Sequence, residues 1–96
     1  MNSEKPTKKR DVRLQQLFDA LGDKTRFTMV QMLQSCDNCV SEIAERLNIT
    51  PAGASQQIKI LESVGILVKT RNGQRTCYDV NTDDPDVKSI INLMSK

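Results

Sequence analysis

The sequence predicts a single α+β domain, mainly α-helical and carrying one β-hairpin. Three observations lead to this fold class. Apolar residues recur at helical spacing in five stretches, the pattern changes to β-rich residues over 66–80, and that segment contains Asn72-Gly73, a strong hairpin turn signal. A length of 96 residues suits one domain and is too short for two ordinary ones.

The N-terminal part divides into an arm and two helices. Residues 1–10 are polar and basic and are expected to form a disordered basic arm, which leaves residues 11–96 as the folded domain. Residues 12–22 are predicted to be a helix that stops at Gly22, and residues 23–35 a helix capped by Asp23. The side chains expected to be buried on the second helix are Phe27, Val30 and Leu33.

Two further helices follow a turn at residues 35–39. The first covers residues 39–48, and a tight connection leads into the second, which ends at Gly65. Thr50 is a suitable N-cap and Pro51 suits the first helical position. The apolar stripe of this second helix consists of Ala54, Ile58, Leu61 and Val64.

The hairpin and a last helix complete the chain. Pairing outward from Asn72-Gly73 places Arg71 beside Gln74 and Val68 beside Cys77, so the tip is basic and exposed. Residues 84–96 then form a helix, with Asp83 or Asp84 as its cap.

Composition limits the classes of function. There are 14 Lys and Arg residues and 12 Asp and Glu residues, and the basic ones gather near the N-terminus and the hairpin, as on a surface that faces a polyanion or as in a solvated tail. We expect no membrane contact and a cytoplasmic location, since no apolar run resembles a leader or a membrane span and three cysteines suit a reducing compartment. Without histidine, a phosphate-binding glycine loop or a paired carboxylate site, an enzyme is not expected.

Two short helices joined by a tight turn and followed by a basic hairpin predict a winged helix-turn-helix. The second helix of such a pair enters the major groove of double-stranded DNA. Its outer face here is small and amide-rich instead of charged, which suits base edges, and the basic hairpin suits the neighbouring backbone. The candidate DNA-binding residues are Thr50, Ala52, Gly53, Ser55, Gln56, Gln57, Lys59, Lys69, Arg71, Asn72, Gln74 and Arg75.

Two alternatives stay open for this surface. A small polar helix face also occurs as plain solvent-exposed surface, and a winged helix can serve as a protein-interaction module. DNA binding predicts affinity that falls steeply with salt, whereas a protein-binding groove predicts an exposed apolar patch.

Three segments resemble a known family. LFDALGDKTRFTMVQML, CVSEIAERLNITPAGASQQIKILESVGIL and RNGQRTCYDV are similar to the ArsR/SmtB-type repressors of bacteria and archaea, over roughly residues 14–80. The resemblance implies a homodimeric repressor that binds an inverted-repeat operator and is released by a metal, metalloid or thiol-reactive signal. It also implies dimerisation through the first and last helices.

The residues themselves supply two apolar stripes for such an interface. Each stripe needs a covering surface, which is either a second subunit or the rest of the same chain. The candidate interface residues are Leu14, Leu17, Phe18, Leu21, Val87, Ile90, Ile91 and Met94.

The cysteines offer a candidate sensing site. Family members that sense arsenic or soft metals often carry Cys-Val-Cys at the start of the third helix, whereas this chain has Cys39-Val40-Ser41, with Cys36 upstream. The family's other site needs histidine and is excluded in its usual form. Cys36 and Cys39 could hold a soft metal ion or arsenite or form a disulfide, with Cys77 as a further ligand, or all three could be structural. No cofactor is required, and a regulator without any sensing is the alternative.

Overall fold

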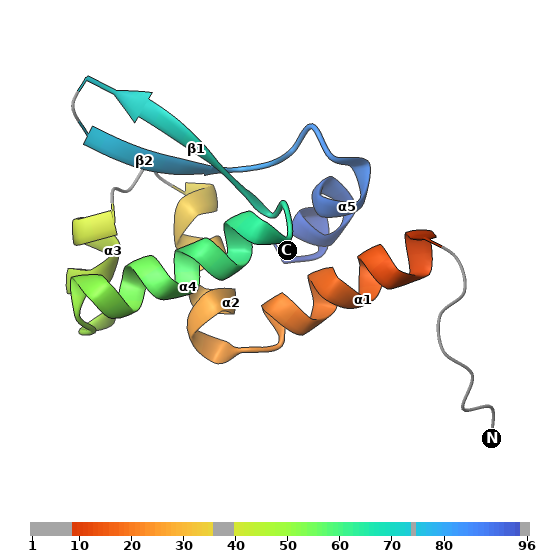
Figure 1. Cartoon of the computed structure of the whole chain (residues 1–96), viewed down its shortest axis with the longest axis horizontal. Helices are drawn as coiled ribbons and strands as arrows, with labels where there is room; N and C mark the ends of the chain where they lie inside the picture. The colour runs from red at the N-terminus through yellow and green to blue at the C-terminus, as the bar shows by residue number, and fades with distance from the viewer. Residues whose placement is uncertain (1–8, 36–39, 74, 95–96) are drawn as a thin grey trace.

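The described part of the chain contains five helices and one antiparallel two-stranded hairpin (Figure 1). The computed structural model describes residues 9–35, 40–73 and 75–94, without the side chains of residues 35, 71, 72 and 75. The elements are α1 (Lys9–Leu21), α2 (Lys24–Ser35), α3 (Val40–Leu47), α4 (Pro51–Ser63), β1 (Leu67–Asn72), β2 (Arg75–Val80) and α5 (Pro85–Met94). This order confirms the predicted α+β class and the helix-turn-helix followed by a wing.

Every helix contributes to one core. Leu17 of α1, Met29 of α2 and Ile43 of α3 are 0% exposed, while Ile58 of α4 and Val87 of α5 are each 1% exposed. The apolar spacing therefore identified most of the buried residues, although it did not single out Met29 of α2. None of the helices in the described ranges is both long and apolar enough to cross a bilayer.

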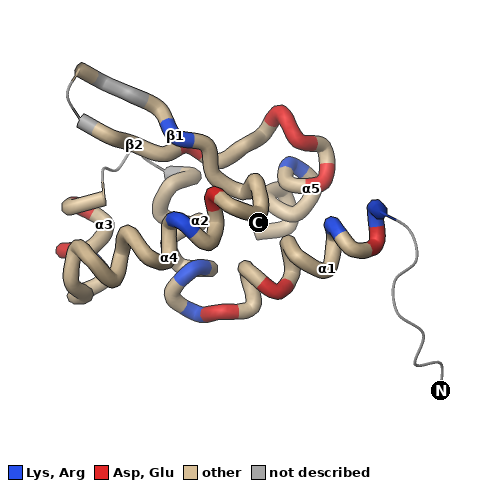
Figure 2. Tube along the Cα trace, in the orientation of Figure 1, with Lys and Arg blue, Asp and Glu red and all other residues tan. Residues whose placement is uncertain are grey.

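The start of α1 differs from the prediction. The helix begins at Lys9, so Lys9 and Arg10, which the sequence assigned to the basic arm, are helical. Arg10 pairs with Asp86 at 3.1 Å, and Arg13 pairs with Asp84 at 2.7 Å. Figure 2 shows the acidic segment before α5 at the same end of the molecule as the start of α1. These two arginines thus neutralise acidic residues of the same chain instead of extending a polyanion-facing surface.

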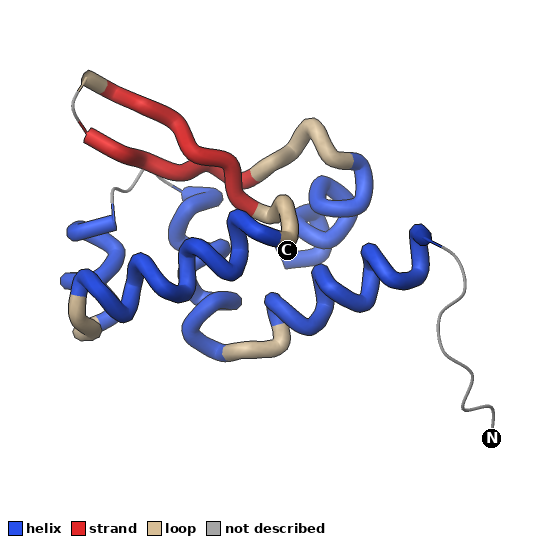
Figure 3. The backbone as a smooth tube through the Cα atoms, viewed as in Figure 1, coloured by secondary structure: helices blue, strands red, loops and turns tan. Residues whose placement is uncertain are grey.

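The register of the hairpin also corrects the prediction. Asn72 pairs with Arg75 and Thr70 with Cys77, so the turn lies one residue later than predicted and the partner of each strand residue changes by two positions. Gly73 has a φ of 67° and therefore supplies the positive φ that tight hairpin turns need at the first loop position. Figure 3 shows the hairpin extending to the same end of the molecule at which α4 begins.

Candidate nucleic-acid interface

The first turn of α4 is fixed by its cap. Thr50 has extended backbone angles, φ −71° and ψ 152°, and its Oγ1 accepts a hydrogen bond from the Gly53 N–H at 3.0 Å. Pro51 occupies the first helical position, where its missing N–H costs nothing. The predicted cap is confirmed, and the Thr50 hydroxyl serves the helix itself.

The turn between α3 and α4 sets the position of that cap. Asn48 has a φ of 56°, the left-handed conformation that ends α3. Its N–H donates to Glu45 O at 3.1 Å, and the Ile49 N–H donates to Ala44 O at 3.0 Å. This pair of bonds is a Schellman motif, and asparagine tolerates the conformation better than most non-glycine residues. The two helices consequently meet at a fixed angle.

The outer face of α4 lies open, as the sequence predicted. Ala52, Gln56 and Lys59 are exposed, and Gly53 and Ser55 are half-buried at the margins of that face. A Cβ added at Gly53 would lie 3.1 Å from Thr50 Oγ1, so the absence of a side chain keeps the cap undistorted and the helix surface low. The face presents an amide and a hydroxyl with little charge, which suits close approach to base edges.

Gln57, the remaining α4 candidate, is half-buried and has a partner that the sequence did not reveal. Arg26 Nη1 of α2 donates to Gln57 Oε1 at 2.7 Å, and Arg26 Nε donates to Ala20 O at 2.7 Å. The Arg26 N–H in turn donates to Asp23 Oδ2, the predicted cap of α2. No sequence pattern could have found this pair, because Arg26 and Gln57 are 31 positions apart.

The wing supplies part of the predicted basic surface. Lys69 is exposed on β1 opposite the buried Tyr78. Burial, followed by the nearby carboxylate of Glu62, raises the pKa of Tyr78 above its ordinary value, so the ring stays neutral. The other wing candidates lie outside the description: residue 74 entirely, and the side chains of Arg71, Asn72 and Arg75.

The last turn of α4 joins three other elements. Gly65, the predicted stop, has a φ of 82°, and its N–H and that of Ile66 donate to Glu62 O and Leu61 O, each at 3.0 Å. Arg13 donates to Val64 O as well as to Asp84. Asn81, just after β2, donates from Nδ2 to Gly65 O at 3.0 Å and from its backbone N–H to Ile66 O at 2.8 Å. Arg13 and Asn81 were not predicted, and both hold the base of the wing and α4 together.

The predicted interface residues are largely covered within the protomer. Leu17, Leu21, Val87, Ile90 and Ile91 are at most 9% exposed. Intramolecular packing, one of the two open alternatives, thus accounts for most of both stripes. The partly buried Leu14 and Met94 pack against the core.

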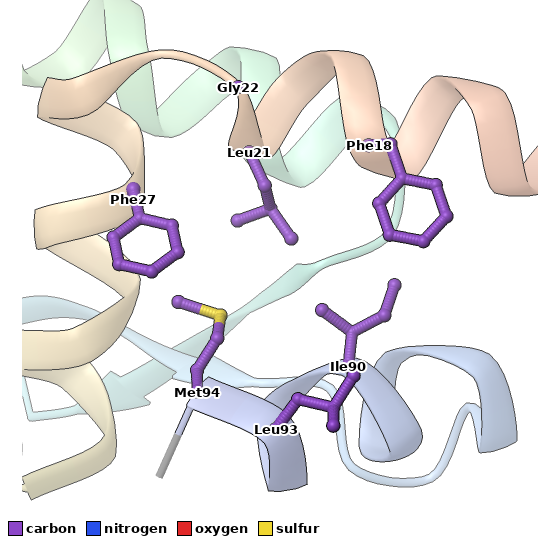
Figure 4. Close-up of a pocket in the computed structure, with 7 residues that line it drawn as sticks. All are labelled: Phe18, Leu21, Gly22, Phe27, Ile90, Leu93 and Met94. Carbon is purple, nitrogen blue, oxygen red and sulfur yellow. The ribbon is translucent and has the colours of Figure 1, made fainter. Parts of the chain in front are cut away.

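An apolar groove remains between α1, α2 and α5. Phe18 is 57% exposed and Leu93, which the sequence did not single out, is 73% exposed. Phe27, predicted to be buried, is 38% exposed because it faces this groove instead of the core. The groove has a volume of about 410 Å³ (Figure 4). Its lining residues are Phe18, Leu21, Gly22, Phe27, Ile90, Leu93 and Met94.

Two of the three cysteines of the predicted sensing site lie outside the residues that the structure describes. Cys36 and Cys39 belong to residues 36–39, which the structure does not describe. Cys77 is half-buried on β2 and lies opposite Thr70, not Val68. Within residues 9–35, 40–73 and 75–94, no three His, Cys, Asp or Glu side chains are grouped so that they could hold a metal ion.

Comparison with known proteins agrees with this architecture. A family model described as bacterial regulatory protein, arsR family, matches residues 23–69. The chain is 28% identical over 82 residues to the transcriptional repressor SdpR of Bacillus subtilis, covering 83% of this chain and 91% of SdpR. It is 30% identical over 71 residues to the arsenical resistance operon repressor of the same organism, covering 73% of this chain and 68% of that protein.

Two solved structures share the fold. HlyU from Vibrio cholerae matches with a TM-score of 0.81 at 23% identity, over 92% of this chain and 94% of that chain. The homodimeric winged helix-turn-helix DNA-binding domain Mb0332 from Mycobacterium bovis matches with a TM-score of 0.77 at 21% identity, over 98% of this chain and 87% of that one. At such identities the likeness concerns the fold.

Proposed function

We propose, from the premise that the chain belongs to the ArsR family of bacterial regulatory proteins, that it is a homodimeric repressor which binds an inverted-repeat operator. Membership makes the chain a transcriptional regulator with a winged helix-turn-helix fold and not an enzyme. Repression agrees with the names of its relatives, SdpR and the arsenical resistance operon repressor.

The open face of α4 carries the proposal. Ala52, Gln56 and Lys59 are exposed on one helix, and the wing with exposed Lys69 extends to the same end of the molecule (Figure 1). In this arrangement the helix enters the major groove, Gln56 contacts base edges, and the two lysines contact phosphates. Ile60 is the one large apolar side chain of α4 that is more than a third exposed, which gives a protein-binding groove little support.

The apolar groove supports self-association. Phe18 and Leu93 stand exposed at its border, a costly arrangement for a monomer in water. A two-fold symmetric contact would bury the same groove on both protomers and relate their two α4 helices by symmetry. Such a dimer reads two half-sites of opposite orientation about one helical turn apart, which is an inverted repeat.

DNA binding is tested by selection from random duplexes, followed by titration of the enriched site at several salt concentrations. We expect an enriched inverted repeat and an affinity that falls steeply with salt. Lys59→Gln and Lys69→Gln should each lower the salt slope by about 2 per dimer, whereas Gln56→Ala should relax base preference and leave the slope unchanged. Enrichment of no sequence, together with a shallow slope, would overturn the proposal.

Dimerisation is tested by sedimentation of a groove variant. Phe18→Asp should convert the dimer to monomer and weaken operator binding at least 100-fold, because each protomer then binds one half-site alone. Val12→Asp is the matched control: Val12 is 42% exposed on the same helix but does not line the groove. A monomeric wild type would remove the dimer from the proposal and leave DNA binding intact.

Thiol sensing is the least supported part of the proposal. Cys36 and Cys39 belong to the four-residue connection between Ser35, where α2 ends, and Val40, where α3 begins, so a bound ion or disulfide there would act on the helix-turn-helix. Operator binding should be measured in reduced and oxidised protein and with arsenite, cadmium or zinc. Release of the wild type but not of the Cys36→Ser, Cys39→Ser double variant supports sensing, and equal behaviour of both rejects it.

A further inference from the structure

The contact between Arg26 and Gln57 restricts what Gln57 can recognise. Arg26 lies in the first turn of α2, and its guanidinium is held by Ala20 O and by Gln57 Oε1, each at 2.7 Å. A guanidinium has five N–H donors and no acceptor. The oxygen of the Gln57 amide must therefore face Arg26, since the reversed amide would point donors at donors.

This orientation leaves the Gln57 NH₂ group facing away from α2. Gln57 is half-buried, and Gly53, one turn earlier on the same flank of α4, adds no side chain above it. The adjacent Gln56 is exposed, and no hydrogen bond holds its amide against another of the described side chains. The two glutamines therefore differ: Gln56 is able to turn its amide, whereas Gln57 presents donors in one fixed direction.

We propose that Arg26 is a positioning residue for operator specificity, which restricts Gln57 to hydrogen-bond acceptors on the base edges. This inference rests on the proposed DNA-binding function. Guanine O6 and N7 and thymine O4 are acceptors in the major groove. Adenine offers N7 as an acceptor, but its neighbouring N6–H₂ is a donor, so the paired glutamine–adenine contact requires both the oxygen and the NH₂ of the amide. Gln57 therefore prefers guanine or thymine to adenine, whose N6–H₂ it would leave unpaired, and only Gln56 is able to make the paired contact with adenine. Because Gln57 is already held, it loses little conformational freedom on binding.

Substitution of Arg26 tests the inference through base preference. Wild type and Arg26→Gln are compared by selection from randomised half-sites, with thermal unfolding to confirm that both fold. Glutamine at position 26 offers both a donor and an acceptor, so the Gln57 amide is free to reverse. At one half-site position we expect the wild-type preference for guanine or thymine over adenine to fall about tenfold. A folded variant with an unchanged profile would overturn the inference.

A second variant works even if Arg26→Gln does not fold. Gln57→Glu keeps an oxygen for Arg26 and replaces the outward donor by an acceptor, so the same position should change to cytosine, whose N4 is a donor. Gln56→Glu is the matched control and should alter a different position. A uniform loss of affinity without a change in base preference would mean that Gln57 contacts phosphate, and would overturn the inference. A wild type that enriches no sequence would instead contradict the proposed function.

Discussion

The two ends of α4 are built from different chemistry. At the C-terminal end, Gly65 and its neighbours take hydrogen bonds from Arg13 and Asn81, which come from α1 and from the residue after β2. At the N-terminal end the exposed face depends on the helix's own cap, Thr50, and on one contact from Arg26 to Gln57. One end is fastened to the domain, and the other has an exposed face that we propose binds DNA. Substitutions at the fastened end should reduce stability, and those at the open end should reduce binding.

The largest loss of stability is expected for Gly65→Ala. With a φ of 82° the position is strained for any side chain, and a Cβ would lie 2.9 Å from Arg13 Nη2. We expect the free energy of unfolding in urea to fall by about 2 kcal/mol. An unchanged denaturation midpoint would contradict the view of this end as the fastened one.

Asn81→Ala should have a smaller effect at the same end. It removes the side-chain hydrogen bond to Gly65 O, which is worth about 1 kcal/mol of unfolding free energy. Thr82→Ala, at the exposed next residue, is the control and should change stability by less than about 0.5 kcal/mol. Equal losses from both variants would show that the loop and not the bond is responsible.

Protonation of Asp84 at low pH should reduce the stability that this residue gives to the fastened end. The hydrogen bond from Arg13, together with those from the Asp86 and Val87 N–H groups at the start of α5, lowers the pKa of Asp84 below its ordinary value. The ionised carboxylate therefore stabilises the fold above about pH 4, and this contribution is lost as the pH falls through the lowered folded-state pKa.

Comparison of unfolding curves at pH 7 and at pH 3 or below measures this contribution. Asp84→Asn should be less stable than wild type at pH 7, with the difference shrinking on acidification. The exposed neighbour in Asp83→Asn serves as control. A difference that does not depend on pH would contradict the role given to the charge.

At the open end, Gly53→Ala should change stability by less than about 1 kcal/mol, because the helix-propensity gain of alanine opposes the close approach of its Cβ to Thr50 Oγ1 at 3.1 Å. Operator affinity, measured by fluorescence anisotropy, should nevertheless fall about tenfold, since a methyl group would stand on the proposed DNA-binding surface. Replacement of glycine by alanine is thus expected to reduce mainly the stability at Gly65 and mainly the operator affinity at Gly53. A Gly53→Ala variant that is destabilised but binds the operator normally would contradict the contrast between the two ends of α4.

Local features were predicted well from the sequence. The Thr50 cap, the Pro51 start and the Gly65 stop are all confirmed. Each of these signals depends only on residues within about one turn of its own position. The hairpin turn was predicted one residue too early, which makes the pairing wrong by two positions. Asn-Gly indicates a nearby turn more strongly than its exact place, and here Gly73 occupies the first loop position.

Contacts between distant segments were beyond sequence reasoning. Arg13 and Asp84 are 71 positions apart, and Arg13 was counted only as a basic residue near the N-terminus. Phe27 fits the apolar period of α2 but lies at the groove, because periodicity identifies an apolar stripe without showing whether the core or a surface groove covers its margin.

The pairing of Asn81 with Gly65 and Ile66 closes the hairpin at its base and leaves its outer end unconstrained by that junction. The length of the two strands then sets how far the tip of the wing lies from its base. Adding two residues to each strand would carry the tip outward by roughly 7 Å and keep the same side chains toward the helices, because strand faces alternate with a period of two. Chains built on this plan could vary how far the wing extends while α4 keeps its place in the domain.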